Sequence, residues 1–110
     1  MTQDFYCEEV LSGKTEVEIV METDKVLAYH HTRPYYEHHI VVIPKVHLQS
    51  LISEEEANDD ELILEIMRVI KKIAADMVER TGASKIVTNL GRYQDSKHLH
   101  WHVISGERVT

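Results

Sequence analysis

One apolar stripe in the middle of the chain limits the folds that the sequence can adopt. Hydrophobic side chains recur at spacings of three and four residues between 62 and 77, which places them on one face of a long helix. Ser53 and Glu56 match a capping box and predict the helix start, and Gly82 is typical of a helix end. We therefore expect one long helix with a single buried face. The stripe consists of Leu62, Ile66, Val69, Ile73 and Met77.

An acidic run at 54–61 precedes the stripe. Negative charge at the beginning of a helix complements the helix dipole, so we interpret the run as a solvated helix start. The run contains no glycine and lacks the ligand spacing of a calcium loop, which argues against a calcium site.

Short apolar segments on both sides of the helix are typical of strands. Residues 40–43 are β-branched throughout and too few for a helix, so they predict a buried central strand that Pro44 ends. Residues 16–21 begin with alternating polar and apolar side chains, and turn residues separate them from 25–29, which predicts a hairpin. The expected strands span 16–21, 25–29, 40–43, 85–90 and 97–104.

The order of the expected elements indicates an α+β fold. A short helix at 3–12, stopped by Gly13, precedes three strands, the long helix and two more strands. Hairpins and meanders of this kind predict an antiparallel sheet with the long helix on one face. The 110 residues contain no repeat, linker or low-complexity segment, so we expect a single domain spanning 1–110.

Charge and cysteine content exclude several classes of partner. The chain carries 12 Lys and Arg against 19 Asp and Glu, a formal charge of −7, which disfavours long nucleic acids and anionic membranes. A small phosphorylated ligand needs only a local site. Cys7 is the only cysteine, so no intramolecular disulfide can form, and residues 1–4 show no signal peptide. No apolar run approaches the ~18 residues of a transmembrane helix, and we expect a cytoplasmic protein.

Three alternating histidines near the end of the chain carry the strongest chemical signal. Side chains alternate between the faces of a strand, so His98, His100 and His102 would share one face. The opposite face, against the core, would carry Leu99, Trp101 and Val103. The structural alternative is a row of exposed histidines, but histidine also serves as acid, base, nucleophile or metal ligand. The other five histidines are His30, His31, His38, His39 and His47.

Strand geometry separates a metal site from a nucleophile. Residues i and i+4 of a strand lie ~13 Å apart, whereas zinc holds each nitrogen at ~2.0–2.1 Å. Two of the three imidazoles plus His39 could bind one ion, which leaves the third histidine without a role. A nucleophilic His100 flanked by His98 and His102 uses all three, and phosphorus suits it as an electrophile. A metal-dependent hydrolase using two triad histidines plus His39, and a nucleotide-binding module without turnover, are the alternatives.

The motif at 98–104 resembles that of the histidine triad (HIT) family, in which three histidines alternate with apolar residues. Residues 40–47 are similar to the family's strand ending in Ile-Pro-Lys, and they put His39 at its fourth active-site histidine. Residues 5–7 resemble the family's aromatic-plus-cysteine opening, and residues 88–91 resemble its Asn-x-Gly segment. Gln94 stands at the position of the family's phosphate-loop Gln, and residues 103–108 resemble the tail of its Hint branch.

This resemblance implies a five-stranded antiparallel sheet with two helices, one of them long, and a homodimer with a continuous ten-stranded sheet. It implies hydrolysis or transfer at the α-phosphate of a purine nucleotide derivative, as in phosphoramidases or dinucleoside polyphosphate hydrolases. The reaction would pass through a nucleotidyl-histidine, without a cofactor and without a metal in the chemical step. His100 would be the nucleophile, with His98, His102 and His39 as its catalytic partners. The implied nucleotide-binding residues are Asn89, Gln94, Asp95, His31 and Thr32.

Two of these positions depart from the family pattern. His31 stands where the family usually has an Asp that binds ribose, and Asp95 stands where many members carry a Ser that meets the α-phosphate. An ionised carboxylate beside a phosphate is repulsive, so either Asp95 turns outward or the ligand differs. The glycines usual before Gln94 are also absent. We therefore expect altered nucleoside recognition around an unchanged nucleophile.

Overall fold

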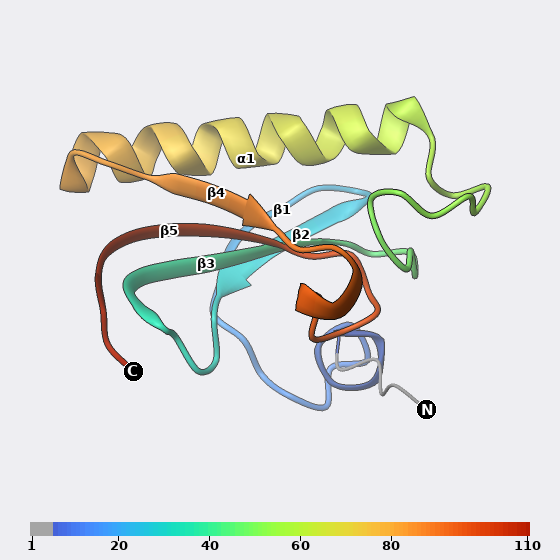
Figure 1. Ribbon diagram of the computed structural model, residues 1–110, viewed down its shortest axis with the longest axis horizontal. Helices are drawn as coiled ribbons and strands as arrows, with labels where there is room; N and C mark the ends of the chain where they lie inside the picture. The colour runs from blue at the N-terminus through green and yellow to red at the C-terminus, as the bar shows by residue number, and fades with distance from the viewer. Residues whose placement is uncertain (1–5) are drawn as a thin grey trace.

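The computed structural model describes residues 6–110. Its strands are β1 (Ile19–Glu22), β2 (Val26–His30), β3 (Tyr36–Pro44), β4 (Lys85–Thr88) and β5 (Trp101–Arg108). Its helical segments are α1 (Asp60–Thr81), the π-helical turn η1 (Tyr6–Val10) and the 3-10 turn η2 (Gly91–Tyr93). The strands form one antiparallel sheet in the order β1-β2-β3-β5-β4, and α1 runs along one face of it (Figure 1). The predicted α+β fold with one long helix is confirmed.

The central strand β3 is buried on both sides. Ile40 and Val42 belong to the apolar cluster beneath α1, whereas Val41 and Ile43 belong to a second cluster that contains residues of η1. Alternation along a strand sends successive side chains to opposite faces, so one β-branched run supplies both clusters. This agrees with the buried central strand expected from the sequence.

The long helix begins later than the capping-box pattern predicts. Asp59 is the N-cap, and its carboxylate accepts a hydrogen bond from Leu62 N at 2.9 Å. The Ser53 hydroxyl instead donates to the carbonyl oxygen of Ser50 at 3.0 Å, so it cannot cap a helix. The predicted start at Ser53 is therefore wrong, and most of the acidic run lies in the preceding loop. The predicted end is confirmed, because Gly82 adopts φ 90° and donates its N–H to the Val78 carbonyl oxygen.

The last strand also begins later than predicted, at Trp101 in place of Lys97. Leu99 N donates to the carbonyl oxygen of Leu48 at 2.6 Å, so this segment is bonded to the loop after β3. His98 and His100 therefore precede the strand, and the prediction of one shared strand face is wrong for them. The side chains that were predicted to face the core do pack in the apolar cluster beneath α1: Leu99, Trp101 and Val103.

The predicted helix at 3–12 lies partly outside the described residues, as do residues 1–4 at the beginning of the chain. Within the described part, η1 contributes Tyr6 and Val10 to the second apolar cluster, and Gly13 follows with φ 82°. None of the helices within 6–110 is long and apolar enough to cross a bilayer.

Candidate active site

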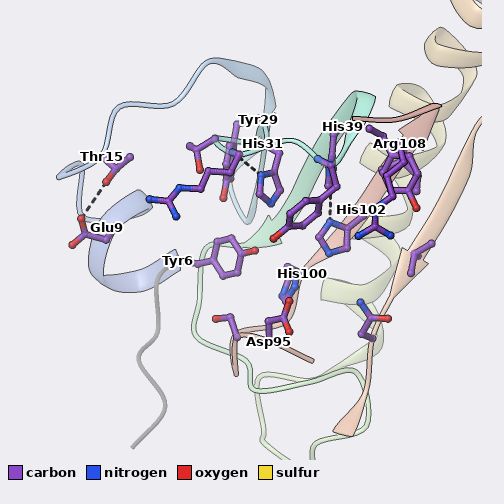
Figure 2. Close-up of a pocket in the computed structure, with 18 residues that line it drawn as sticks. Tyr6, Glu9, Thr15, Tyr29, His31, His39, Asp95, His100, His102 and Arg108 are labelled. Carbon is purple, nitrogen blue, oxygen red and sulfur yellow. Dashed lines mark hydrogen bonds between the residues drawn. The ribbon is translucent and has the colours of Figure 1, made fainter. Parts of the chain in front are cut away.

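A cavity of about 800 Å³ opens beside η1, on the sheet face opposite α1 (Figure 2). Its walls come from η1, the end of β2 and the loop that follows, β3, β4 and the residues after it, β5 and the segment before β5. Four of the eight histidines line it: His31, His39, His100 and His102. The carboxylate and guanidinium side chains around them are Glu9, Arg33, Asp95 and Arg108. The cavity therefore brings together chain segments that are far apart in the sequence.

His100 is held with one defined ring nitrogen available. Its Nδ1 lies 2.9 Å from the carbonyl oxygen of His98, which can only accept, so Nδ1 carries the proton. Nε2 then keeps its lone pair. The side chain is 5% exposed and packs 5.0 Å from the Tyr6 ring, measured between centroids. Burial lowers the pKa of His100, whereas the bond to His98 and the charge of Asp95 act in the opposite direction. A neutral imidazole with a free Nε2 is the nucleophilic form of histidine.

His39 and His102 form a hydrogen-bonded pair beside His100. Tyr35 N donates to His39 Nδ1 at 3.1 Å, so the proton of neutral His39 lies on Nε2. His39 Nε2 lies 2.8 Å from His102 Nδ1 and donates to it (Figure 2). Because His102 Nδ1 accepts this hydrogen bond, the proton of neutral His102 lies on its Nε2. The pair orients one N–H donor beside His100, whose ring centroid lies 5.1 Å from that of His102.

His31 adds a further imidazole next to the pair. Its ring centroid lies 4.4 Å from that of His39 and 6.2 Å from that of His102. Arg33 N donates to His31 Nδ1 at 2.9 Å, so the proton of neutral His31 also lies on Nε2. Burial, followed by the charge of His100, lowers the pKa of His31. His31 is therefore a neutral hydrogen-bond donor at pH 7.

His98 lies outside the cavity lining, although the sequence prediction groups it with His100 and His102. It is fully buried, its Nε2 donates to the Pro44 carbonyl oxygen at 3.0 Å, and its Nδ1 lies 3.2 Å from Cys7 Sγ. Through its own carbonyl oxygen it orients the ring of His100.

Several predicted nucleotide-binding residues line the cavity, and one does not. Asn89, Asp95 and Thr32 line it, and Asp95 is exposed to solvent. Gln94 is buried elsewhere, and its side-chain nitrogen donates to the carbonyl oxygen of Gln49 at 2.7 Å. Ser96 is a lining residue that sequence reasoning missed. Its buried hydroxyl has no hydrogen-bond partner among the described residues, which leaves it available to a ligand.

A simple signal could have found other missed residues. The alternation that starts at His102 continues along β5 to Ile104 and Arg108, which both line the cavity. The aromatic lining residues come from η1, β2, β3 and the loop between the two strands, and no sequence pattern links them: Tyr6, Tyr29, Tyr35 and Tyr36.

In each of two clusters, the ligand atoms of three potential metal-binding residues lie within 4.8 Å of one another. The cluster of Cys7, His47 and His98 has the sulfur and nitrogen donors that zinc prefers, and an ion there would tie η1 to the segment before β5. The cluster of His31, His39 and His102 fits a metal poorly. A histidine that binds a metal donates its other ring N–H, but Nδ1 of both His31 and His39 already accepts from a backbone N–H.

The buried histidine pair should make the protein sensitive to acid. Burial, followed by the charges of nearby imidazoles, lowers the pKa of His39 to about 4 and that of His102 to about 3. In the unfolded chain these two histidines take up protons as the pH falls below about 6.5, whereas in the native protein both stay neutral there. Protonation of the unfolded chain therefore lowers the free energy of unfolding only below about pH 6.5. We expect the urea midpoint to fall steadily as the pH drops from about 6.5 toward about 4. In a His39→Asn/His102→Asn variant this dependence should weaken, whereas His30→Asn should leave it unchanged.

The comparisons with known proteins agree with this geometry. The HIT domain family model matches residues 12–109. An uncharacterized HIT-like protein of Helicobacter pylori is 25% identical over 107 residues, 92% of this chain and 95% of the relative. One from Methanocaldococcus jannaschii is 30% identical over 104 residues, 87% and 74% of the two chains. The crystal structure of a HIT family hydrolase from Legionella pneumophila superposes with a TM-score of 0.79 at 26% identity, over 98% of this chain and 96% of that one. The chain has the fold of HIT family hydrolases and belongs to the HIT family.

Proposed function

We propose that this chain hydrolyses or transfers nucleotide derivatives at their α-phosphate, through a covalent intermediate on His100. The observation that carries the proposal is the hydrogen bond from His100 Nδ1 to the His98 carbonyl oxygen. It fixes the tautomer and orientation of the ring, which is what a histidine nucleophile requires. Phosphoramidates and dinucleoside polyphosphates are the substrate classes that we expect.

The chemistry takes two steps. In the first, the lone pair of His100 Nε2 attacks phosphorus, a P–N bond forms, and the bond to the leaving group breaks. The electron pair goes to the leaving group, which takes a proton from solvent, while His102 Nε2–H donates a hydrogen bond to the developing charge. In the second, water attacks phosphorus, the P–N bond breaks, one water proton returns to solvent, and His100 regains its lone pair. An alcohol in place of water would give transfer.

Neutral donors from three elements can surround the phosphate. Ser96 offers a hydroxyl without a protein partner, and Asn89 and His102 line the same cavity. Asp95 contributes a negative charge that repels a phosphate oxygen. We infer that the phosphate oxygens face Ser96 and His102, and that the carboxylate of Asp95 stays on the solvent side.

A covalent-trapping experiment tests the proposal. The protein is mixed with an adenosine or guanosine phosphoramidate in EDTA, quenched in alkali, which preserves P–N bonds, and analysed by intact mass. We expect one nucleotidyl group per chain on the peptide that contains His100, and steady turnover that EDTA does not change. A Cys7→Ser variant tests in parallel whether the cluster of Cys7, His47 and His98 affects turnover.

Two outcomes would contradict the proposal in favour of the alternatives. If EDTA abolishes turnover and zinc restores it, a metal-dependent hydrolase that uses two triad histidines plus His39 is the better description. If calorimetry detects nucleotide binding while no derivative is cleaved, the chain is a binding module. Neither outcome is compatible with a nucleophilic His100.

We also propose that two copies pair through β4 to form the ten-stranded sheet that the family resemblance implies. β4 is an edge strand, and its Ile86 is 48% exposed. An exposed edge with an apolar side chain favours pairing with another strand. We expect sedimentation equilibrium to give a dimer mass for the wild type and a monomer mass for Ile86→Lys. Ile52→Lys, which changes an exposed residue in the loop between β3 and α1, serves as control, and a wild-type monomer would refute the pairing.

A further inference from the structure

The proposed nucleophile lies just outside the sheet. β5 begins at Trp101, which pairs with Thr88 of β4 and with Val42 of β3, and these are the last pairs of both ladders. His100 comes one residue earlier, in backbone that belongs to neither ladder. Hydrogen bonds outside the ladders therefore fix the place of His100.

Two hydrogen bonds hold the residues that lead into His100. Leu99 N donates to the carbonyl oxygen of Leu48 at 2.6 Å, and His98 Nε2 donates to that of Pro44 at 3.0 Å. Both acceptors belong to the end of β3 or to the loop that follows it. These bonds act on the chain before His100, so the carbonyl group of His100 itself needs a further partner.

Thr88 of β4 is that partner. Its hydroxyl donates to the His100 carbonyl oxygen at 2.8 Å, and the direction of the bond is defined because a carbonyl oxygen can only accept. Thr88 is half-buried and does not line the cavity, whereas its neighbours Val87 and Asn89 do. Alternation along the strand accounts for this difference. Thr88 therefore contacts the backbone of the nucleophile and not the ligand.

We propose that Thr88 is a positioning residue for the reaction: by holding the His100 carbonyl oxygen, it keeps the ring in the orientation from which Nε2 attacks phosphorus. This role rests on the proposed function for the identity of the reaction. The bond to the His98 carbonyl oxygen sets which ring nitrogen carries the proton, and the bond from Thr88 holds the backbone from which the ring projects. A displacement of about 1 Å in a reacting group can cost about 100-fold in rate.

Single-turnover kinetics at saturating nucleoside phosphoramidate test this role. Thr88→Val replaces the hydroxyl with a methyl group, and it should lower the rate of nucleotidyl transfer to His100 by about 10- to 100-fold. The affinity for AMP, measured by calorimetry, should stay within about twofold of the wild-type value, because Thr88 does not contact the ligand. Thr88→Ser retains the hydroxyl and should recover most of the rate. Thr88→Ala, which places no methyl group against the carbonyl oxygen, should show the same loss as Thr88→Val.

Thr81→Val is the matched control. The Thr81 hydroxyl also donates to a backbone carbonyl oxygen at 2.8 Å, that of Met77, but Thr81 lies in α1 and does not line the cavity. The substitution therefore removes a hydrogen bond of the same kind. We expect the urea midpoint to fall in both valine variants, whereas the single-turnover rate should fall only in Thr88→Val.

Nitrogen NMR with isotopically labelled histidine follows the His100 ring without any turnover. In the wild type, Nδ1 should be protonated and Nε2 unprotonated, as the bond to the His98 carbonyl oxygen requires. The signals that disappear in His100→Ala assign this ring. In Thr88→Val the two nitrogen signals should move toward each other, because a less restrained ring leaves that bond and exchanges tautomers. Thr81→Val should leave both signals unchanged.

An unchanged rate in Thr88→Val would overturn the inference, and so would a loss that Thr88→Ser shares in full, a loss confined to AMP affinity or an equal loss in Thr81→Val. If the wild type forms no nucleotidyl-histidine, the proposed function is refuted, while the nitrogen signals still report whether Thr88 orients the ring. If transfer is normal in the wild type but the nitrogen signals do not change in Thr88→Val, only the positioning role is refuted. Both failures together would refute both proposals.

Discussion

Replacing His100 with alanine is expected to lower kcat/KM for nucleotide release by at least about a thousandfold. The substitution removes the only imidazole of the cavity whose Nε2 lone pair is fixed by a bond from Nδ1 to a carbonyl oxygen. His31, His39 and His102 cannot replace it, because each carries its proton on Nε2 in the hydrogen-bonded arrangement. Steady-state release of the monophosphate measures the loss, and intact mass should detect no nucleotidyl-protein.

Two further variants make this result specific. His100→Gly should recover part of its activity in added imidazole, since a free imidazole can occupy the vacated space and attack phosphorus. His30→Asn changes an exposed histidine outside the cavity and should retain wild-type kinetics. Retained turnover in His100→Ala, with circular dichroism unchanged, would rule out a histidine nucleophile at this position.

Local sequence patterns predict the fold better than they predict element boundaries. The β-branched run at 40–43 and the apolar stripe at 62–77 identify β3 and α1, because burial of a periodic face decides those elements. The helix start is not decided by the pattern around Ser53. Asp59 competes with Ser53 as a cap, and contacts within the preceding loop settle which of the two is used.

The same distinction explains which site residues could be predicted. His39 and His102 lie in strands, where alternation puts both on the cavity face and the pairing of β3 with β5 brings them together. His98 and Gln94 lie in irregular backbone, so tertiary hydrogen bonds to Pro44 and Gln49 set their direction. A motif in the sequence reports the presence of such residues but not the direction in which they point.

Replacing His102 with alanine is expected to lower kcat by about 100- to 1000-fold, the usual effect of removing one donor that meets developing charge. The variant loses the Nε2–H that faces the cavity, and it also leaves His39 Nε2–H without its acceptor. Single-turnover rates at saturating substrate measure the effect on the chemical step. His102→Asn retains an N–H donor and should recover part of the rate, whereas a loss confined to KM would indicate a role in binding alone.

The pH dependence decides whether His102 acts as a neutral donor or as an acid. An imidazolium would need one more proton on the pair, but His39 Nδ1 faces Tyr35 N–H and His102 Nδ1 faces His39 Nε2–H. No ring nitrogen of the pair can accept a proton unless one of these bonds breaks, which agrees with pKa values of about 4 for His39 and about 3 for His102. The wild-type rate should therefore stay level from about pH 6 to about pH 8. A rate that falls tenfold per pH unit across this range would mean that a protonated pair delivers the proton and that substrate binding rearranges these hydrogen bonds.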